Sequence, residues 1–521
     1  GVFWIGLPLL VVQQLVYAGA CVALTRALVP WLRPAGVQFS LYALLLWNPM
    51  SFDAGNLGRL MRQNVYTPLG MLVVAGLIQL HARRRESWQR QAGPAVLAGL
   101  SLGGFWLTRE ESVWLLPAVG LLFLGIGLSL GRELVAGWRK AVLSLGLFLL
   151  AALLPILVVC TLNYRYYGWF GTVEFRAPEF KAAYGALTRI KVGPELPQVP
   201  VTREMRELAY EISPAFAELR PAFEGNVGDN WIDRTIFLPS ERQIRGGWFV
   251  WALRDAMVAA GRGGDPATAM RHYQRIADEV NAACDSGRVP ARRPRSGFLP
   301  PLGWESVRPL LAGTVEYGSF FLFFKNFTAV SPDSLGDYAE LKPFRDLVGS
   351  RLSHAPRSPE LSTPNQDDWS NRKVAWLESI GVSTSRLIGW LGPFLLFAGF
   401  VRFLESLIAR RITFLLGLAG ALLAACSAYL AINVLVHVTS FYNMSPAAMA
   451  SAYPLYLLAL FVIGADLLTV RHEAVAVEPS LVPSSPPSRW TWAISAGAAL
   501  AVFAARLREI HLYAGDVPYN D

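Results

Sequence analysis

Three consecutive charged residues, Arg109, Glu110 and Glu111, lie between two long apolar stretches of the sequence. The turn Arg109-Glu110-Glu111 separates two apolar stretches. Charges between such stretches are costly unless they are paired or face a water-filled cavity. Arg109 can hold a phosphate, and Glu110 or Glu111 can take a proton from a hydroxyl group. The alternative is an ion pair between Arg109 and one glutamate that simply closes the turn.

A second group of charges lies between residues 51 and 63. Asp53 is followed by Arg59 and Arg62, so that one acid and two cations adjoin the end of an apolar run. Asp53 is therefore a candidate for proton transfer, and the two arginines are candidates for binding a substrate phosphate. The alternative is that Asp53 caps a helix while the arginines extend their charged ends into water.

His437 and Tyr442 follow a later apolar run and are further candidates for binding substrate. A single histidine near a membrane interface is more often a hydrogen-bonded structural residue, which is the alternative here. The polar loop from Gly225 to Trp231 contains glycines and an aromatic residue. Such a loop binds a sugar by stacking and hydrogen bonds, or is simply a turn.

No cofactor motif accompanies these residues. The four cysteines form no CxxC motif and no cluster with histidine, so the sequence predicts neither a metal site nor a disulfide framework. Walker A, GxSxG, HExxH and dinucleotide-binding patterns are absent. A divalent cation is the one cofactor left open.

The elements that must position these residues are membrane-spanning helices. Of the 521 residues, 53% are hydrophobic and 16% are charged, against about 25% charged residues in soluble domains. The net charge of +9 comes with arginines in short loops between apolar runs, which is typical of cytoplasmic loops. We therefore expect a lipid bilayer as partner and no nucleic acid.

Ten stretches are predicted to span the membrane, on the basis that a span needs about 20 apolar residues. They are residues 3–26, 36–50, 64–81, 93–108, 111–130, 141–163, 384–404, 412–436, 448–470 and 490–505. Three arginine-rich loops fall on one side by parity, and this side is predicted to be cytoplasmic. The candidate residues then lie on the outer side of a membrane that we expect to be the bacterial inner membrane. Because Gly1 begins within an apolar run, we also expect the natural protein to extend upstream.

The predicted fold is an all-α polytopic membrane protein of about ten helices, with a mainly helical extracytoplasmic domain inserted mid-chain. The predicted parts are helices one to six at 1–163, the inserted domain at 164–383, helices seven to nine at 384–470, a cytoplasmic linker at 471–489, and the last helix with an external tail at 490–521. Within the domain, one helix is predicted from Thr202 to Ala222, and Pro214 is expected to kink it or to end it early. Another is predicted from Asp265-Pro266 to Gly287, with signals at both ends.

The N-terminal third resembles a known family. Trp47-Asn48-Pro49, the stretch from Arg62 to Gly70, and the stretch from Gly103 through Glu111 to Pro117 resemble the third and fourth helix region of bacterial GT-C glycosyltransferases. The likeness covers about residues 1–165. It implies a multi-spanning enzyme that takes a sugar from a polyprenyl-phosphate donor on the outer face, with its main catalytic acid upstream of Gly1.

Two functions follow as hypotheses. The first is a membrane glycosyltransferase that moves a sugar from a polyprenyl-phosphate donor to an envelope acceptor by a single inverting displacement. A carboxylate would activate the acceptor, and arginines would neutralise the departing lipid phosphate. The second is a non-catalytic membrane subunit whose external domain binds envelope proteins or glycans. A transporter is disfavoured, because too few charges lie at helix centres to mark a substrate path.

Overall fold

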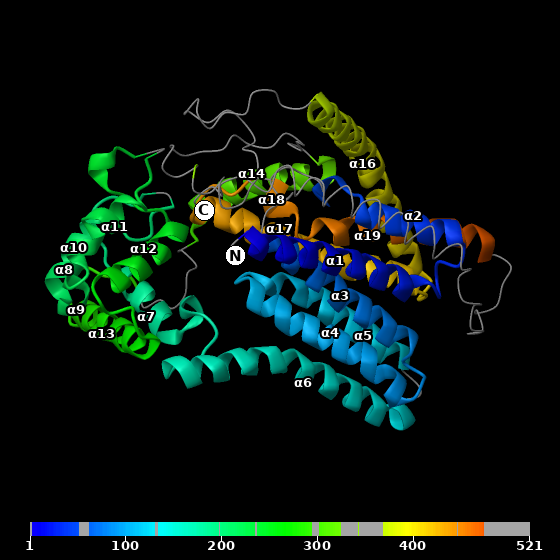
Figure 1. Cartoon of the computed structure of the whole chain (residues 1–521), viewed down its shortest axis with the longest axis horizontal. Helices are drawn as coiled ribbons and strands as arrows, with labels where there is room; N and C mark the ends of the chain where they lie inside the picture. The colour runs from blue at the N-terminus through cyan, green and yellow to red at the C-terminus, as the bar shows by residue number, and fades with distance from the viewer. Residues whose placement is uncertain are drawn as a thin grey trace. The chain divides into compact units, whose positions relative to one another are not determined.

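Helices make up the regular structure of this protein wherever the computed structural model describes it, apart from one β-bridge between Ile190 and Ala291 (Figure 1). The structure describes residues 3–51, 62–130, 134–196, 198–234, 237–293, 302–324, 342, 368–444 and 446–473. The predicted all-α fold is confirmed for these residues. The predicted linker and last span, together with the external tail, lie outside them, because the description ends at Glu473.

The chain forms two compact units. The first contains residues 1–154, 316–430 and 445–521, and the second contains residues 155–315 and 431–444. The second unit therefore differs in extent from the inserted domain that we predicted at 164–383. It takes in the segment 431–444 from much later in the chain, as described below, whereas the segment after Val315 groups with the first unit.

The first unit is built mostly from long helices. They are α1 (Phe3–Leu28), α2 (Ala35–Leu46), η1 (Pro49–Ser51), α3 (Gln63–Ala82), α4 (Trp88–Thr108), η2 (Ser112–Leu115), α5 (Leu116–Leu130), α16 (Asp368–Ile408), α18 (Pro446–Met449) and α19 (Tyr453–Glu473). Three further helices, α6 (Leu134–Tyr167), α14 (Trp304–Phe323) and α17 (Phe414–Thr439), each have residues in both units. Helix α3 packs between α1 and α4, as Figure 1 shows.

Five helices are long and apolar enough to cross a membrane. They contain the stretches Val11–Leu28, Gln63–Ala82, Arg139–Tyr167, Ala375–Ile408 and Phe414–Thr439. Three shorter apolar helices cover Ala35–Leu46, Ser112–Leu128 and Tyr453–Leu468. Each of these eight stretches overlaps a predicted span. The count of about ten spans is not confirmed, because α4 is not among the apolar helices and 490–505 lies outside the described residues.

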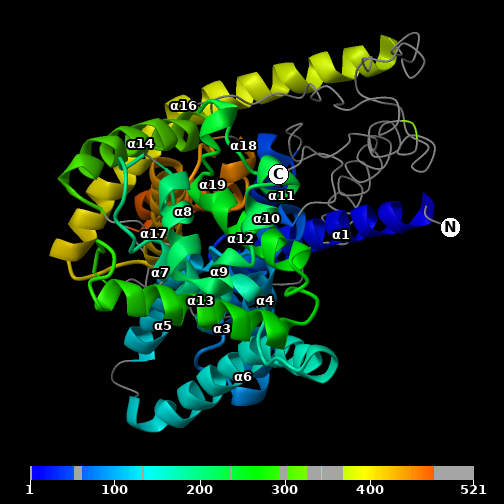
Figure 2. The same ribbon diagram turned by 90° about the vertical axis from the view of Figure 1, so that its left-hand side faces the viewer.

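The outward-facing side chains of these helices are apolar. On the long helix α16, which Figure 2 shows along much of its length, Trp390 and Phe397 are largely exposed. On α6 the same is true of Leu150. Soluble proteins rarely expose such continuous apolar surface, whereas hydrocarbon chains accept it. The apolar helices thus indicate a lipid bilayer environment.

Segments next to two of the predicted cytoplasmic loops lie together at one end of the first unit. The ring of Phe414, which opens α17, stacks on Trp31 after α1 and on His81 near the end of α3, with ring centroids 4.0 and 4.3 Å apart. The arginine-rich turn after His81 and Arg410-Arg411 before Phe414 therefore lie at the same end. Their cytoplasmic location stays a prediction.

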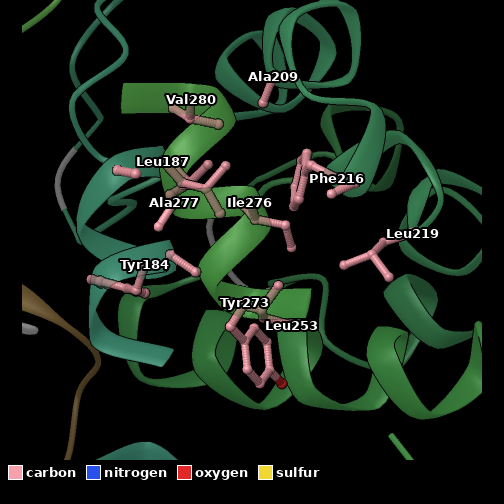
Figure 3. Close-up of a cluster of buried hydrophobic side chains, with 14 of the residues drawn as sticks. Tyr184, Leu187, Ala209, Phe216, Leu219, Leu253, Tyr273, Ile276, Ala277 and Val280 are labelled. Carbon is pink, nitrogen blue, oxygen red and sulfur yellow. The ribbon is translucent and has the colours of Figure 1, made fainter. Parts of the chain in front are cut away.

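The second unit has a hydrophobic core of its own, formed by shorter helices. They are η4 (Glu174–Arg176), α7 (Pro178–Leu187), α8 (Arg203–Ile212), α9 (Pro214–Ala217), α10 (Arg220–Phe223), α11 (Asn226–Asp229), η5 (Pro239–Glu241), α12 (Gly246–Ala259) and α13 (Pro266–Asp285). Helix α13 contacts α7, α8 and α9 (Figure 2). Buried side chains such as Tyr184, Phe216 and Tyr273 meet between these helices (Figure 3).

Both helix starts predicted in this unit are confirmed. The Thr202 hydroxyl accepts a hydrogen bond from the Met205 amide, and α8 ends at Ile212, where Pro214 starts the separate helix α9. The Asp265 carboxylate accepts from the Thr268 amide at 2.9 Å and caps α13. Gly287 follows the end of α13 with a φ of 72°, a conformation that glycine adopts without steric cost.

A buried ion-pair network ties α8 to the segments that follow it. The Arg206 guanidinium has no exposed surface and lies 3.0 Å from a Glu224 carboxylate oxygen. Arg242 approaches the second Glu224 oxygen at 3.2 Å, and the Tyr210 hydroxyl donates to Glu224 at 3.0 Å. Burial alone would raise the pKa of Glu224, but the Arg206 charge and these hydrogen bonds hold it below its ordinary value.

The segment 431–444 completes the second unit. The Gln198 side-chain amide donates to the main-chain carbonyl of His437 at 2.6 Å. At the start of α12, a Cβ atom on Gly247 would collide with the ring of Phe441. Glycine is therefore required here by close approach, and the end of α17 is a built-in part of this unit.

Candidate functional site

The turn after α4 is held by a serine side chain. Ser112 is fully buried. Its hydroxyl bonds to the carbonyl oxygens of Phe105 at 2.9 Å and Arg109 at 2.6 Å, so the chain reverses within three residues. The hydroxyl has one proton to donate, which it shares between these two carbonyls or gives to one of them, and this bond helps a tight turn to lie among apolar helices. The turn fixes where Glu110 and Glu111 lie.

Arg109 pairs with Glu111 within this turn. Its guanidinium also lies over the ring of Tyr66 on α3, 5.8 Å from the ring centroid. Burial alone would lower the pKa of Arg109, but the Glu111 carboxylate outweighs burial and raises it. Arg109 therefore keeps its charge, and the ion pair that we considered as the alternative for this turn is present.

The Tyr66 ring lies against the Arg109 guanidinium and is held in place by contacts with Phe105 and Trp114. It is fully buried, and its ring is stacked nearly parallel on Phe105, with centroids 4.0 Å apart. The Trp114 indole N–H donates to the Tyr66 hydroxyl at 2.9 Å. A rigid aromatic group below the guanidinium adds a cation–π attraction and sets where the charge lies.

Arg62 and Glu110 form a second, looser pair beside the first. Their closest atoms are 3.4 Å apart, and their side chains are 58% and 43% exposed. Arg62 precedes the first turn of α3, four residues before Tyr66, so both point to the same side of the helix. The structure thus brings together four predicted residues: Arg62, Arg109, Glu110 and Glu111.

A small polar cavity adjoins this cluster along α3. Its volume is about 40 Å³, enough for about three water molecules or an equivalent group of hydroxyls. Five carboxamide side chains line it: Gln13, Gln14, Asn48, Gln63 and Asn64. Hydroxyl groups of Tyr17, Ser51 and Thr67 join them, and none of the described residues that line the cavity is charged. We call this the amide pocket.

Asn48 is the most enclosed of these amides. It is 1% exposed, and its amide group donates to the Tyr17 hydroxyl at 2.9 Å and to the Leu45 carbonyl at 2.8 Å. These two bonds fix which way the side chain faces. Its carbonyl oxygen is buried and accepts no hydrogen bond from the residues that the structure describes.

His437 and Tyr442 belong to the second unit. Their rings are 4.9 Å apart, and the Tyr442 ring lies 4.9 Å from the Arg245 guanidinium, which in turn pairs with the buried Asp233. Gln198 bonds to the main-chain carbonyl of His437 and not to its ring, so the structural alternative for His437 stays a prediction. The predicted substrate contact of either residue is not tested by these contacts.

Two other predicted residues, Asp53 and Arg59, lie outside the described residues. Within the described ranges, no three histidine, cysteine or acidic residues gather as metal ligands. The polar loop from Gly225 to Trp231 forms the short helix α11, and Trp231 donates to Asp255 at 3.0 Å.

Sequence reasoning did not find the amide pocket. One signal was present: Gln13 and Gln14 lie side by side in the middle of the first apolar run. Polar residues inside a predicted span are costly and mark buried or functional positions. The other amides come from α3 and from the segment between α2 and η1, so only the folded chain brings them together.

Comparison of the chain with protein-family models, with curated proteins and with solved structures gave no match.

Proposed function

We propose that this protein is a membrane glycosyltransferase that moves a sugar from a polyprenyl-phosphate donor to an envelope acceptor on the outer face. The proposal depends mainly on one observation, which is that the exposed pair of Arg62 and Glu110 adjoins a pocket at one end of α3 whose described lining residues are polar or apolar but uncharged. A cation, a carboxylate and an uncharged hydrogen-bonding cavity are what a lipid phosphate, an acceptor hydroxyl and a sugar require.

Glu110 is the better of the two candidates in the turn for the general base. Its side chain is 43% exposed, whereas that of Glu111 is 21% exposed and lies against Arg109. In the proposed step, Glu110 takes the proton of the acceptor hydroxyl while the acceptor oxygen bonds to the anomeric carbon. The bond from that carbon to the phosphate oxygen breaks, and its electron pair leaves with the polyprenyl phosphate.

Arg62 is the proposed phosphate ligand. Its present pair with Glu110 is exposed and 3.4 Å long, and such pairs contribute about 0–1 kcal/mol. Arg62 can therefore exchange Glu110 for a phosphate at little cost. Arg109 and Glu111 hold the turn against Tyr66 and act as positioning residues.

The test is transfer by the full chain in lipid nanodiscs. The probes are polyprenyl monophosphates that carry radiolabelled hexoses or pentoses, with loss of label from the lipid phase as the readout. Glu110→Gln should lower the rate about 100-fold or more, the range for a general base. Glu86→Gln is the matched control, because Glu86 also forms an exposed pair with an arginine, at 3.3 Å from Arg90. Transfer that survives Glu110→Gln would refute the role of Glu110.

The second candidate is a non-catalytic membrane subunit whose external domain binds envelope proteins or glycans. It is favoured by the closed pair of Arg109 and Glu111, which neutralises two charges without any substrate. If the wild-type chain transfers no sugar from any of these donors, this second function becomes the better proposal.

A further inference from the structure

Helix α14 carries an exposed apolar stripe along one side. Trp304 is 91% exposed, Leu311 is 64% exposed and Val315 is 74% exposed. These residues are seven and four positions apart, and this spacing places them in one row of a helix. Gly313 and Tyr317, on the opposite side, are buried. The stripe is therefore a continuous apolar surface, and such a surface marks contact with a membrane or another protein.

In the second unit, α14 touches the last turns of α17. A Cβ atom on Gly313 would lie 3.1 Å from the Val434 side chain and 3.6 Å from that of Val438. The other end of α17 begins at Phe414, directly after Arg410-Arg411, a charge pair typical of a headgroup region. Val434 lies about 20 residues beyond Phe414, which is the length that crosses the hydrocarbon. The contact with α14 therefore falls near the opposite surface of the hydrocarbon.

In the first unit, the second half of α14 lies at the same depth. The Phe321 ring is 6.1 Å from that of Tyr453, the first residue of α19. A Cβ atom on Gly389 of α16 would lie 3.2 Å from the Phe323 ring, and Gly389 is about 20 residues before Ile408, where α16 ends. Helix α14 thus follows the surface of the hydrocarbon instead of crossing it. It is also not among the helices that are apolar enough to cross a membrane.

The charged residues of α14 match a boundary between lipid and water. Glu305 follows Trp304 by one position and Glu316 follows Val315 by one, so both acids lie about 100° round the helix from the stripe, on the same flank. Arg308 is exposed one turn after Trp304, at the edge of the stripe. A bilayer surface accepts the three kinds of side chain together, because acyl chains take the apolar row, lipid phosphates take the arginine and water takes the acids.

We propose that α14 is an interfacial helix, which lies in the leaflet next to the Thr439 end of α17. Trp304, Leu311 and Val315 lie among the acyl chains, and Arg308 lies at the level of the lipid phosphates. Because residues 304–315 belong to the second unit, α14 holds that unit to the bilayer in addition to α6 and α17. This inference goes beyond the proposed function and does not depend on it, because it involves neither a sugar nor the turn after α4.

Spin labels on single introduced cysteines of the full chain in vesicles test the depth of α14. The readout is the collision rate of each label with oxygen, which concentrates in hydrocarbon, and with a neutral nickel chelate, which stays in water. Labels at Leu311→Cys and Val315→Cys should favour oxygen, and this preference should invert at Glu305→Cys and Glu316→Cys. The wild-type chain, whose four cysteines are buried, gives the background.

Val258→Cys is the matched control. Val258 is an exposed apolar residue of α12 in the same unit, and its label should favour the nickel chelate. Labels at 311 and 315 that favour the nickel chelate would overturn the inference, because the stripe would then face water. Few collisions with either reagent at these positions would overturn it in favour of a protein partner. Oxygen preference at all four positions of α14 would overturn it in favour of a spanning helix.

Arg308 is tested by its preference for anionic lipid. The vesicles contain phosphatidylcholine with a minority of phosphatidylglycerol, and one or the other lipid carries a quencher of a fluorophore at Val315→Cys. Phosphatidylglycerol should quench about fivefold more per quencher, as expected for one arginine at an anionic surface. Arg308→Gln should remove this preference, whereas Arg271→Gln, at an exposed arginine of α13, should keep it. Equal quenching by both lipids in the parent chain, or a preference that survives Arg308→Gln, would overturn the assignment of Arg308.

Discussion

Replacing Glu224 with glutamine should open the region around α8 in the second unit. The substitution keeps the shape of the side chain but removes the negative charge beside Arg206, which has no exposed surface. Loss of one partner from a fully buried pair costs about 3–5 kcal/mol. Because Glu224 is 17% exposed and Arg206 also donates to the Arg242 carbonyl at 2.9 Å, we expect the lower end, about 3 kcal/mol.

Hydrogen–deuterium exchange of the full chain in detergent micelles measures this change locally. A loss of about 3 kcal/mol corresponds to a roughly 100-fold larger population of the open state, so amides of α8 that exchange by local opening should exchange about 100-fold faster. Glu207→Gln is the control on the same helix. Its pair with Arg220 is largely exposed, and its loss should change exchange less than about fivefold.

Equal protection of α8 in Glu224→Gln and Glu207→Gln would refute the reasoning that burial makes the first pair important. A double variant gives a second check. Arg206→Met combined with Glu224→Leu removes both charges, and apolar replacement of a buried pair is often neutral or stabilising. Protection of α8 should then recover much of what the single variant loses.

Three further predictions concern separate contacts. Because the folded-state pKa of Glu224 is depressed, its contribution to stability is present above the pKa of the unfolded state and is lost as the pH falls through the folded-state pKa. Exchange of α8, corrected for intrinsic rates, should therefore rise in acid for the wild type and much less for Glu224→Gln. Gly247→Ala should destabilise the second unit by about 1–3 kcal/mol through overpacking against Phe441, which a lower thermal unfolding temperature would show. Tyr66→Phe removes the acceptor of the buried Trp114 indole; it should cost about 1–3 kcal/mol and change Trp fluorescence, whereas an unchanged unfolding temperature would contradict that role.

Features that depend on neighbouring residues were predictable from the sequence. The starts of α8 and α13 follow from Thr202 and Asp265, since a capping side chain bonds to amides two or three residues later. The pair of Arg109 and Glu111 follows in the same way from three adjacent charges. Arg62 and Glu110 were both predicted on the outer side of the membrane, but the contact between them appears only in the folded chain.

Features assembled from distant segments were not predictable. The amide pocket draws on Gln13, Asn48, Gln63 and Ala450, and no local pattern links these positions. The second unit differs in extent from the domain predicted at 164–383 for the same reason. The segment 431–444 belongs to an apolar helix by composition, and only its contacts with Gln198 and Gly247 assign it to that unit.

The segment 431–444 is synthesised well after the rest of the second unit, and this delay affects how the domain folds during translation. Residues 316–430 separate the two parts of the second unit, and synthesis of that stretch at about 5–20 residues per second takes roughly 6–23 s. During this interval the nascent domain has its core helices but lacks the segment that contacts Gly247. We therefore expect the incomplete domain to need a chaperone or the translocation machinery beside it. Chains that stop before His437 should be degraded even though their sequence from 155 to 315 is intact.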